Sequence, residues 1–311
     1  MKILTFLDGY AYNLDIKTHF SEDIMRITDV LRKGKGTLSF EIFPPKGDFD
    51  ANAVRALLGE LAPLSPSYLS VTYSAGGSKN SALTAEIAEM TEKEFYLPSV
   101  SHITVINNTP EEVSATIDSF AAKGIENVLA LRGDKIEGTD LRYFAHATDI
   151  IPTLVERGFT VGASCYPEGH ATCISLDDDI RYMKMKQDMG ASYFVSQLCF
   201  DNRYFFDFFS RIKKAGVDSL LSAGIMPIMS KAQVNRMIYM CAVSLPGAII
   251  RILNRYDEDK EGLLQAGLDY AAAQIAELYD SGVDDIHFYT MNRPDAAKGL
   301  VERLRAKGYL K

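Results

Sequence analysis

The chain has 311 residues, 47% of them hydrophobic, and can therefore bury a large core in one large α/β domain or two smaller ones. Its formal net charge of −8 comes without any run of Lys or Arg, which argues against nucleic acid or an anionic membrane as the partner and favours a small molecule. The N-terminal apolar stretch is interrupted by Asp8 and Gly9 and is too short for a signal peptide or a membrane-spanning helix, so we expect a cytoplasmic protein.

The first expected element is a helix within residues 1–35. The segment "SEDIMRITDVLRKGKG" begins with Ser21, a residue type that caps helix N-termini, and ends in a basic turn that suits a helix C-terminus. We expect this helix to cover the bottom of the fold that follows.

Eight β-rich runs follow in order, and longer amphipathic segments separate them. The runs cover 37–43, 68–74, 98–106, 127–134, 160–168, 193–200, 219–228 and 285–292. Five of the amphipathic segments end in "AAKG", "VERG", "QDMG", "KKAG" and "YDSG", where Gly suits a helix C-cap.

Eight β-then-α units in one chain most simply form an α/β fold of the (β/α)8 barrel type, with a doubly wound open sheet as the alternative. A long helical region at 245–282 adds extra helices between strands seven and eight. We treat residues 1–311 as one domain, with 1–35 as an N-terminal extension and 36–311 as the barrel.

The first strand, in "TLSFEIFPPKG", carries a carboxylate near its end. Alternation along the strand turns Leu38, Phe40 and Ile42 toward the helices and leaves Ser39, Glu41 and Phe43 inside the barrel. The same alternation turns a further polar set inward, namely Ser70, Thr72, His102, Thr104, Gln197, His287 and Tyr289. Barrel enzymes keep their active sites at this mouth, so we predict one here, although any one of these residues could instead make an ordinary interior hydrogen bond.

Two strand ends add further polar groups. Arg132, Gly133 and Asp134 end the fourth run and offer a donor, a close backbone approach and a carboxylate, although an Arg–Asp pair closing a loop is also possible. The fifth run ends in "CYPEGH", whose Glu168 and His170 lack a third metal ligand at a recognisable spacing. We therefore expect no metal.

Other common site signatures are missing from the sequence. The Gly-rich "YSAGGSKN" matches neither the Rossmann nor the Walker pattern, so any nucleotide cofactor must be held in another way. The four cysteines show neither a CxxC pair nor zinc spacing, and we expect them to be reduced thiols.

Seven ordered motifs resemble a known family. "FEIFPPKG", "SVTYSAGGS", "SHITV", "ALRGD", "YPEGH", "SQLCFD" and "HFYTMNR" occur in the order and spacing of methylenetetrahydrofolate reductase, the flavin enzyme of one-carbon metabolism. The resemblance implies a (β/α)8 barrel with non-covalent FAD, reduced by NADH or NADPH. It also implies hydride transfer to 5,10-methylenetetrahydrofolate, which yields 5-methyltetrahydrofolate.

The resemblance also implies residue roles. Glu41 matches the general acid that helps to open the folate imidazolidine ring. Asp134 matches a carboxylate near both the flavin and the pterin, which stabilises the resulting cation and makes Asp134 a cofactor-binding residue as well. Thr72 matches a flavin-ring contact, Gln197 a pterin contact and Arg293 a folate contact, and we assign the inward Tyr289 to the substrate side as well. The remaining FAD matches are His102, Arg132, Gly133, Ser164, Tyr166, His170, Asp179 and Lys186. Lys186 also has a reason of its own, because a cation near a pyrophosphate can replace part of a glycine loop.

The chain departs from the family pattern in two places. Leu253 stands where an aromatic residue stacks on substrate, which leaves the choice between NADH and NADPH open, and Met291 replaces a Leu. The length suggests the short, bacterial-type form, and we expect a homo-oligomer. Another FAD-linked barrel oxidoreductase and a non-catalytic, partner-binding barrel remain the alternative functions.

Overall fold

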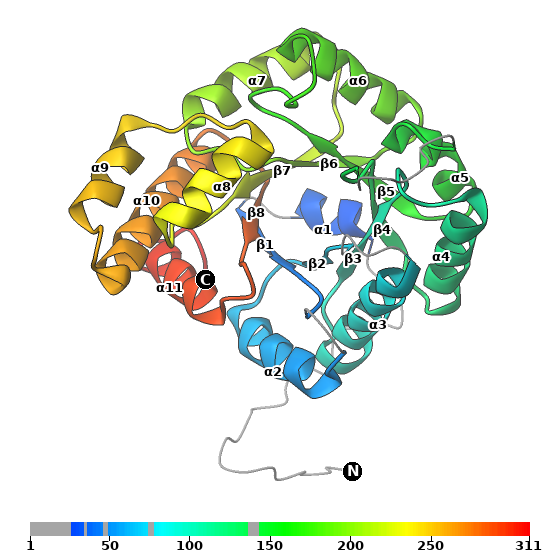
Figure 1. Ribbon diagram of the computed structural model, residues 1–311, viewed down its shortest axis with the longest axis horizontal. Coiled ribbons are helices and arrows are strands. Elements are labelled where there is room, and N and C mark those ends of the chain that lie inside the picture. Colours follow the sequence, from blue (N-terminus) through cyan, green and yellow to red (C-terminus); the bar gives the residue numbers. More distant parts are fainter. Residues whose placement is uncertain (1–25, 34–35, 46–48, 74–77, 136–142) are drawn as a thin grey trace.

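The strands form a closed parallel barrel in the order β1 to β8 (Figure 1). The computed structural model describes residues 26–33, 36–45, 49–73, 78–135 and 143–311. The strands are β1 (Thr37–Ile42), β2 (Leu69–Val71), β3 (Ser99–Thr104), β4 (Asn127–Leu131), β5 (Thr160–Cys165), β6 (Tyr193–Ser196), β7 (Leu220–Ile225) and β8 (Asp285–Tyr289). All eight predicted strands are confirmed, and the closed order rules out the open-sheet alternative.

Helices surround the barrel. They are α2 (Ala51–Leu61), α3 (Ser78–Phe95), α4 (Pro110–Ala122), α5 (Ile151–Glu156), α6 (Leu176–Asp188), α7 (Asn202–Lys214) and α11 (Pro294–Ala306), with short 3-10 turns η2 (Ala62–Leu64) and η3 (Ala147–Asp149). The five glycines predicted to end helices all have positive φ, for example +78° at Gly124 and +110° at Gly190. The predicted C-caps are therefore confirmed.

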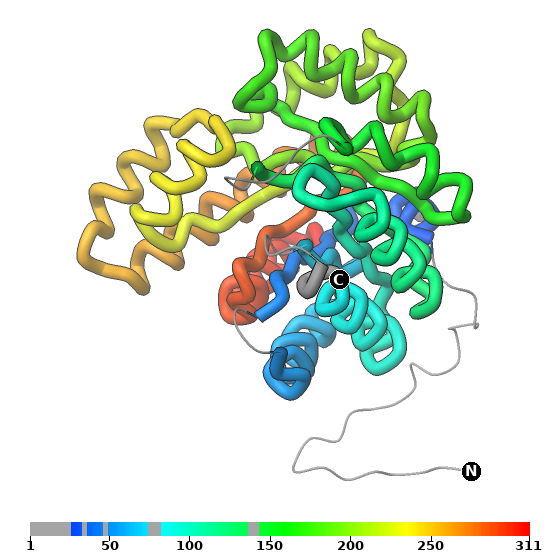
Figure 2. The backbone as a smooth tube through the Cα atoms, turned by 45° about the vertical axis from the view of Figure 1, so that its right-hand side comes forward, coloured from blue at the N-terminus to red at the C-terminus, as the bar shows by residue number. Residues whose placement is uncertain are grey.

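Between β7 and β8 the chain forms α8 (Lys231–Cys241), α9 (Gly247–Arg255) and α10 (Lys260–Asp280). Figure 2 shows α8 and α9 projecting from one side of the barrel. They have a hydrophobic core of their own, which includes Leu198, Ile228, Ile249 and Leu263. The predicted extra helices are confirmed.

Helix α1 (Ile27–Lys33) lies within the ring of strands in Figure 1. The buried side chains of Ile27 and Leu31 pack on Tyr68, Val100, Leu129, Tyr193 and Val195. The backbone N–H of Ile27 donates to the side chain of Asn127, the first residue of β4, at 2.9 Å. The helix therefore covers the barrel bottom as predicted, while its proposed cap Ser21 lies outside the described residues.

The predicted alternation along β1 is confirmed. Leu38, Phe40 and Ile42 belong to the main hydrophobic core, whereas Ser39 and Glu41 contact polar residues inside the barrel. Within the described ranges, no helix combines the length and the apolar character needed to cross a membrane.

Candidate active site

Glu41 lies inside the barrel with only 7% of its surface exposed. Its Oε2 atom is 3.5 Å from Nε2 of His287 on β8 and 3.8 Å from Nε2 of His102 on β3. The strand register explains the convergence, because Glu41 pairs with Ser70 on β2 and with Tyr289 on β8. The structure thus gathers four of the predicted inward residues around the carboxyl group of a fifth, Glu41.

A buried polar chain lies below Glu41. His287 Nδ1 is 2.8 Å from the Ser39 hydroxyl, which also contacts Asp285 Oδ2 at 3.1 Å, and Tyr68 stacks on the His287 ring. Burial raises the pKa of Asp285 to about 6, against the opposing effect of hydrogen bonds from Thr37 and other neighbours.

Neither Asp285 nor Tyr68 was predicted from the sequence. Asp285 left a usable signal, because it stands two residues before His287 and therefore shares its face of β8. Tyr68 left the same signal, because it stands two residues before Ser70 in the run at 68–74.

His102 is a neutral imidazole at working pH. Burial lowers its pKa to about 4, although nearby Glu41 acts in the opposite direction. Its Nε2 atom lies 2.7 Å from the Ser70 hydroxyl, which fixes the ring. This hydrogen bond orients His102 beside the Glu41 carboxyl group.

A strained turn after β8 holds the end of β1. The Thr290 hydroxyl donates to the Glu41 carbonyl at 2.6 Å. The Asn292 amide bridges Phe43, accepting from its N–H at 2.8 Å and donating to its carbonyl at 2.9 Å. Met291 and Asn292 both adopt left-handed backbone conformations, with φ of 56° and 52°. This turn was not predicted from the sequence.

Five of the proposed FAD residues gather at the ends of β5 and α6. Lys186 donates to the Ser164 carbonyl at 2.8 Å, and its Nζ atom lies 6.0 Å from the centre of the Tyr166 ring. Tyr166 packs edge-on against His170 at 4.8 Å, and the His170 N–H donates to Asp179.

This edge of the mouth carries two cations, Arg132 and Lys186, and two acidic residues, Asp134 and Asp179. Burial lowers the pKa of His170, and the charges of Arg132 and Lys186 lower it further. Burial also lowers the pKa of Lys186. In the part of the chain that the structure describes, neither Arg132 nor Lys186 is in a salt bridge, so both cations stay available to an anionic ligand.

Gly133 packs its backbone closely against Thr104 at the same edge. Its φ is +85°, and a Cβ atom there would lie 3.0 Å from the Thr104 side chain. Two cations, an aromatic ring and a bare backbone turn are the chemistry that a dinucleotide with a pyrophosphate needs. The residues present therefore fit FAD.

The other proposed substrate residues are spread around the mouth. Tyr289 donates to the Ser196 carbonyl at 2.7 Å, and Gln197 accepts from the Leu198 N–H at 2.9 Å. Thr72 directly follows β2 and is half-buried. All three lie at strand ends.

Asp134 and Arg293 are more exposed. Asn107 donates to the Asp134 carbonyl at 2.6 Å, while the Asp134 side chain faces solvent. Arg293 pairs with Asp295, at 2.8 Å between Nε and Oδ1. The structure thus does not bring Arg293 to Glu41.

Glu168 and His170 do not converge on a common point. Glu168 accepts from the Ser244 N–H at 2.9 Å, whereas His170 faces Tyr166. No group of three or more His, Cys, Asp or Glu residues that could hold a metal occurs among the described residues. The four cysteines, all of them described, are free.

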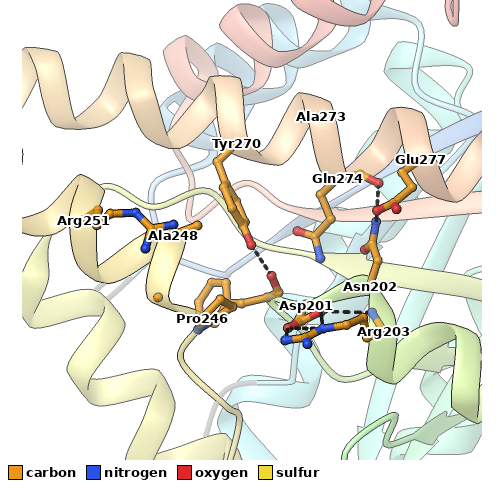
Figure 3. Close-up of a pocket in the computed structure, with 12 residues that line it drawn as sticks. Asp201, Asn202, Arg203, Pro246, Ala248, Arg251, Tyr270, Ala273, Gln274 and Glu277 are labelled. Atoms are coloured by element: carbon orange, nitrogen blue, oxygen red, sulfur yellow. Dashed lines mark hydrogen bonds and ion pairs between the residues drawn. The ribbon is translucent and has the colours of Figure 1, made fainter.

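A separate cavity of about 770 Å³ lies between the start of α7, the start of α9 and α10 (Figure 3). Its polar groups largely pair with one another, since Arg203 binds Asp201 and Asn202 bridges to Glu277 and the Gln274 carbonyl. Leu253 is 6% exposed in the adjoining core and offers no open stacking surface. The barrel mouth is therefore the better candidate site.

Comparisons with known proteins place the chain in a family. The family described as methylenetetrahydrofolate reductase matches residues 26–305. Methylenetetrahydrofolate reductase 1 of Schizosaccharomyces pombe is 31% identical over 90% of this chain and 48% of its own length. Methylenetetrahydrofolate reductase (NADH) 1 of Arabidopsis thaliana is 29% identical over 90% of this chain and 50% of its own length. The chain thus spans about half the length of these relatives.

A shorter relative and a solved structure are also similar. The 5,10-methylenetetrahydrofolate reductase of Escherichia coli is 29% identical over 88% of this chain and 92% of its own length. A structure described as an uncharacterized protein from Clostridium thermocellum that binds two copies of 5-methyl-5,6,7,8-tetrahydrofolic acid has a TM-score of 0.63 at 14% identity. The superposition covers 92% of this chain and 99% of the Clostridium thermocellum chain. At that identity it supports the fold alone.

Proposed function

Because the chain belongs to the methylenetetrahydrofolate reductase family, we propose that it reduces 5,10-methylenetetrahydrofolate to 5-methyltetrahydrofolate, with bound FAD and with NADH or NADPH as the reductant. The observation that carries this proposal is Glu41, a carboxyl group inside the barrel with two imidazoles near it and no cation within ion-pairing distance among the described residues. A carboxyl group in such surroundings can hold and donate a proton.

The edge of the mouth that carries Arg132 and Lys186 is the proposed cofactor site. Arg132 and Lys186 would bind the pyrophosphate, with Gly133 offering its backbone. Thr72, His102, Ser164, Tyr166, His170 and Asp179 would complete the pocket. When bound, FAD supplies the hydride-transfer chemistry that connects NADH or NADPH to the folate.

Glu41 would deliver its proton to N10 of the folate as the imidazolidine ring opens to a 5-iminium cation. Asp134 at the end of the β4 run would stabilise that cation with its negative charge. Gln197, Tyr289 and Arg293 would position the pterin and the rest of the folate. For Arg293 this requires release from Asp295.

The proposed setting is the cytoplasm, with the chain assembled as a homo-oligomer. Neither proposal affects the chemistry at the mouth. Both can be checked separately, by fractionation and by light scattering.

The proposal is tested by purifying the protein and releasing its cofactor with acid. We expect a yellow protein that releases FAD and not FMN, and that oxidises NADH or NADPH only when 5,10-methylenetetrahydrofolate is present as the acceptor under anaerobic conditions. Separate titrations with NADH and NADPH identify the reductant. A colourless protein that gains no absorbance from added FAD would contradict the proposal, and a yellow protein inert to the folate would point to another barrel oxidoreductase.

A further inference from the structure

We propose that His287 is a positioning residue that, held by Ser39 and Asp285, offers a buried acceptor nitrogen to Glu41 and so keeps this carboxyl group in its acid form. The inference rests on the proposed function, because it explains how the proton donor is loaded.

The Ser39 hydroxyl has a single proton and three polar neighbours. They are Asp285 Oδ2 at 3.1 Å, the Ile286 carbonyl at 3.2 Å and His287 Nδ1 at 2.8 Å. A carboxylate and a carbonyl can only accept, so the Ser39 proton goes to that side. With its pKa near 6, Asp285 is ionised at neutral pH and takes this role. The Ser39 oxygen must then accept a proton from Nδ1 of His287.

With Nδ1 protonated, a neutral His287 ring leaves Nε2 as an acceptor. Nε2 is buried and has no hydrogen-bond partner within the described ranges, and Glu41 Oε2 faces it at 3.5 Å. If Glu41 were ionised, its Oε2 atom and Nε2 of His287 would both be acceptors and would repel each other. The acid form of Glu41 instead donates its proton to Nε2. A small rotation of the carboxyl group would bring Oε2 and Nε2 into hydrogen-bond range. Hydrogen bonds in active sites are often long in the free protein and shorten when ligand binds.

The alternative is a charged His287 paired with an ionised Glu41. That arrangement buries both charges, and the desolvation cost of two buried charges disfavours it. No cation faces the pair from the neighbouring described elements. Tyr68 and Tyr289 remain neutral because burial raises the pKa of each, and burial holds His102 neutral. Asp285 is the one anion on the far side of the ring.

His102 cannot take the same role. Its Nε2 atom is already hydrogen-bonded to the Ser70 hydroxyl at 2.7 Å and lies farther from Glu41, at 3.8 Å. The two imidazoles beside Glu41 therefore differ. Nε2 of His102 already has a hydrogen bond, whereas Nε2 of His287 has none within the described residues.

Two substitutions of His287 distinguish the role of its side chain as a hydrogen-bond acceptor from its role in filling space. In His287→Gln the side-chain carbonyl can occupy the position of Nε2 as an acceptor, whereas His287→Phe fills the space without one. Ser39→Ala is a smaller third variant that releases Nδ1. Ser101→Ala is the matched control, because Ser101 is also a buried strand serine but its hydroxyl has no hydrogen bond within the described part of the chain.

The first readout is the pH dependence of flavin reoxidation by 5,10-methylenetetrahydrofolate in stopped flow. In His287→Phe we expect the rate at neutral pH to fall about tenfold, and the pH at which the rate declines to move about one unit lower. Ser39→Ala should move in the same direction by less, while His287→Gln and Ser101→Ala should stay within about threefold of the wild type. Flavin reduction by the pyridine nucleotide should not change in any variant.

The second readout needs no cofactor. Infrared difference spectra of the cofactor-free protein, titrated over about pH 5 to 9, should show a carboxylic acid band that disappears in Glu41→Gln and is lost at lower pH in His287→Phe. A Phe variant with an unshifted band and an unshifted rate profile would overturn the inference, as would equal slowing of both half-reactions. A wild-type protein that does not react with the folate would instead contradict the proposed function.

Discussion

Glu41 differs from an ordinary interior residue in how its carboxyl group is surrounded. Ser70 with His102, and Ser39 with His287, form short hydrogen bonds, so the ordinary-interior interpretation holds for those groups. Among the described residues, the contacts of Glu41 Oε2 are the longer ones to the two imidazoles. Burying a carboxyl group without a strong hydrogen-bond partner lowers the stability of the fold. Such groups are typical of functional sites.

Asp134 provides a prediction for the second carboxylate. As an anion beside the proposed cofactor edge it should stabilise a cationic folate and oppose electron gain by the flavin. Asp134→Asn should therefore slow folate reduction at least about tenfold and raise the reduction potential of the flavin. Stopped flow and spectroelectrochemical titration measure the two effects, with the surface variant Glu60→Gln as control. An unchanged folate rate would remove Asp134 from the mechanism.

Asp285 makes stability depend on pH. Its pKa is raised from 3.8 to about 6, so between those values the folded state binds the proton more tightly than the unfolded state does. The free energy of unfolding should then fall by roughly 3 kcal/mol as the pH rises through this window. In Asp285→Asn this fall should disappear, and urea unfolding at several pH values measures it. The exposed Asp188→Asn is the control, and equal pH slopes in Asp285→Asn and the wild type would contradict the expectation.

At the scale of elements, strand positions followed from the sequence but strand ends did not. In the run at 127–134 the strand ends at Leu131, and in the run at 193–200 it ends at Ser196. Leu198 and Phe200 continue the apolar run because they are buried in the core beneath α9 and α10, not because the sheet extends. Apolar content marks burial, and it identifies a strand only where the ladder of hydrogen bonds continues.

The turn after β8 is an element that pattern reading could not find. The turn holds the end of β1 through hydrogen bonds between Asn292 and Phe43, which is 249 residues away in the chain. No local signal encodes such a contact, and Met291 is an unusual residue for a left-handed position.

Asn292→Gly tests this turn while leaving its backbone conformation accessible. Loss of both hydrogen bonds to Phe43 should lower the free energy of unfolding by about 1–3 kcal/mol and slow folate reduction, because the end of β1 carries Glu41. The control Met291→Gly loses the packing of Met291 against the neighbouring core but keeps both hydrogen bonds to Phe43, so its folate reduction should stay near the wild-type rate. Thermal unfolding and stopped flow provide the measurements. If both glycine variants behave alike, the side-chain bridge has no such role.

At the scale of the whole molecule, the barrel brings together strand ends that are far apart in sequence. The (β/α)8 fold followed from eight repeats and their terminal glycines, and this fold in turn predicted that the polar residues converge. The contacts beneath them, from Tyr68 to Asp285, depend on side-chain packing inside the barrel and could not be derived from periodicity.

The substitution Glu41→Gln tests the central claim most directly, because it keeps the shape of the side chain but cannot donate a proton. Hydride transfer from NADH or NADPH needs no acid, whereas opening of the folate ring needs a proton at N10. Stopped flow should show flavin reduction within about tenfold of the wild type and folate reduction slowed by at least about 10²-fold. Equal slowing of both half-reactions, or loss of FAD or of thermal stability, would mean that Glu41 is structural and would contradict the account.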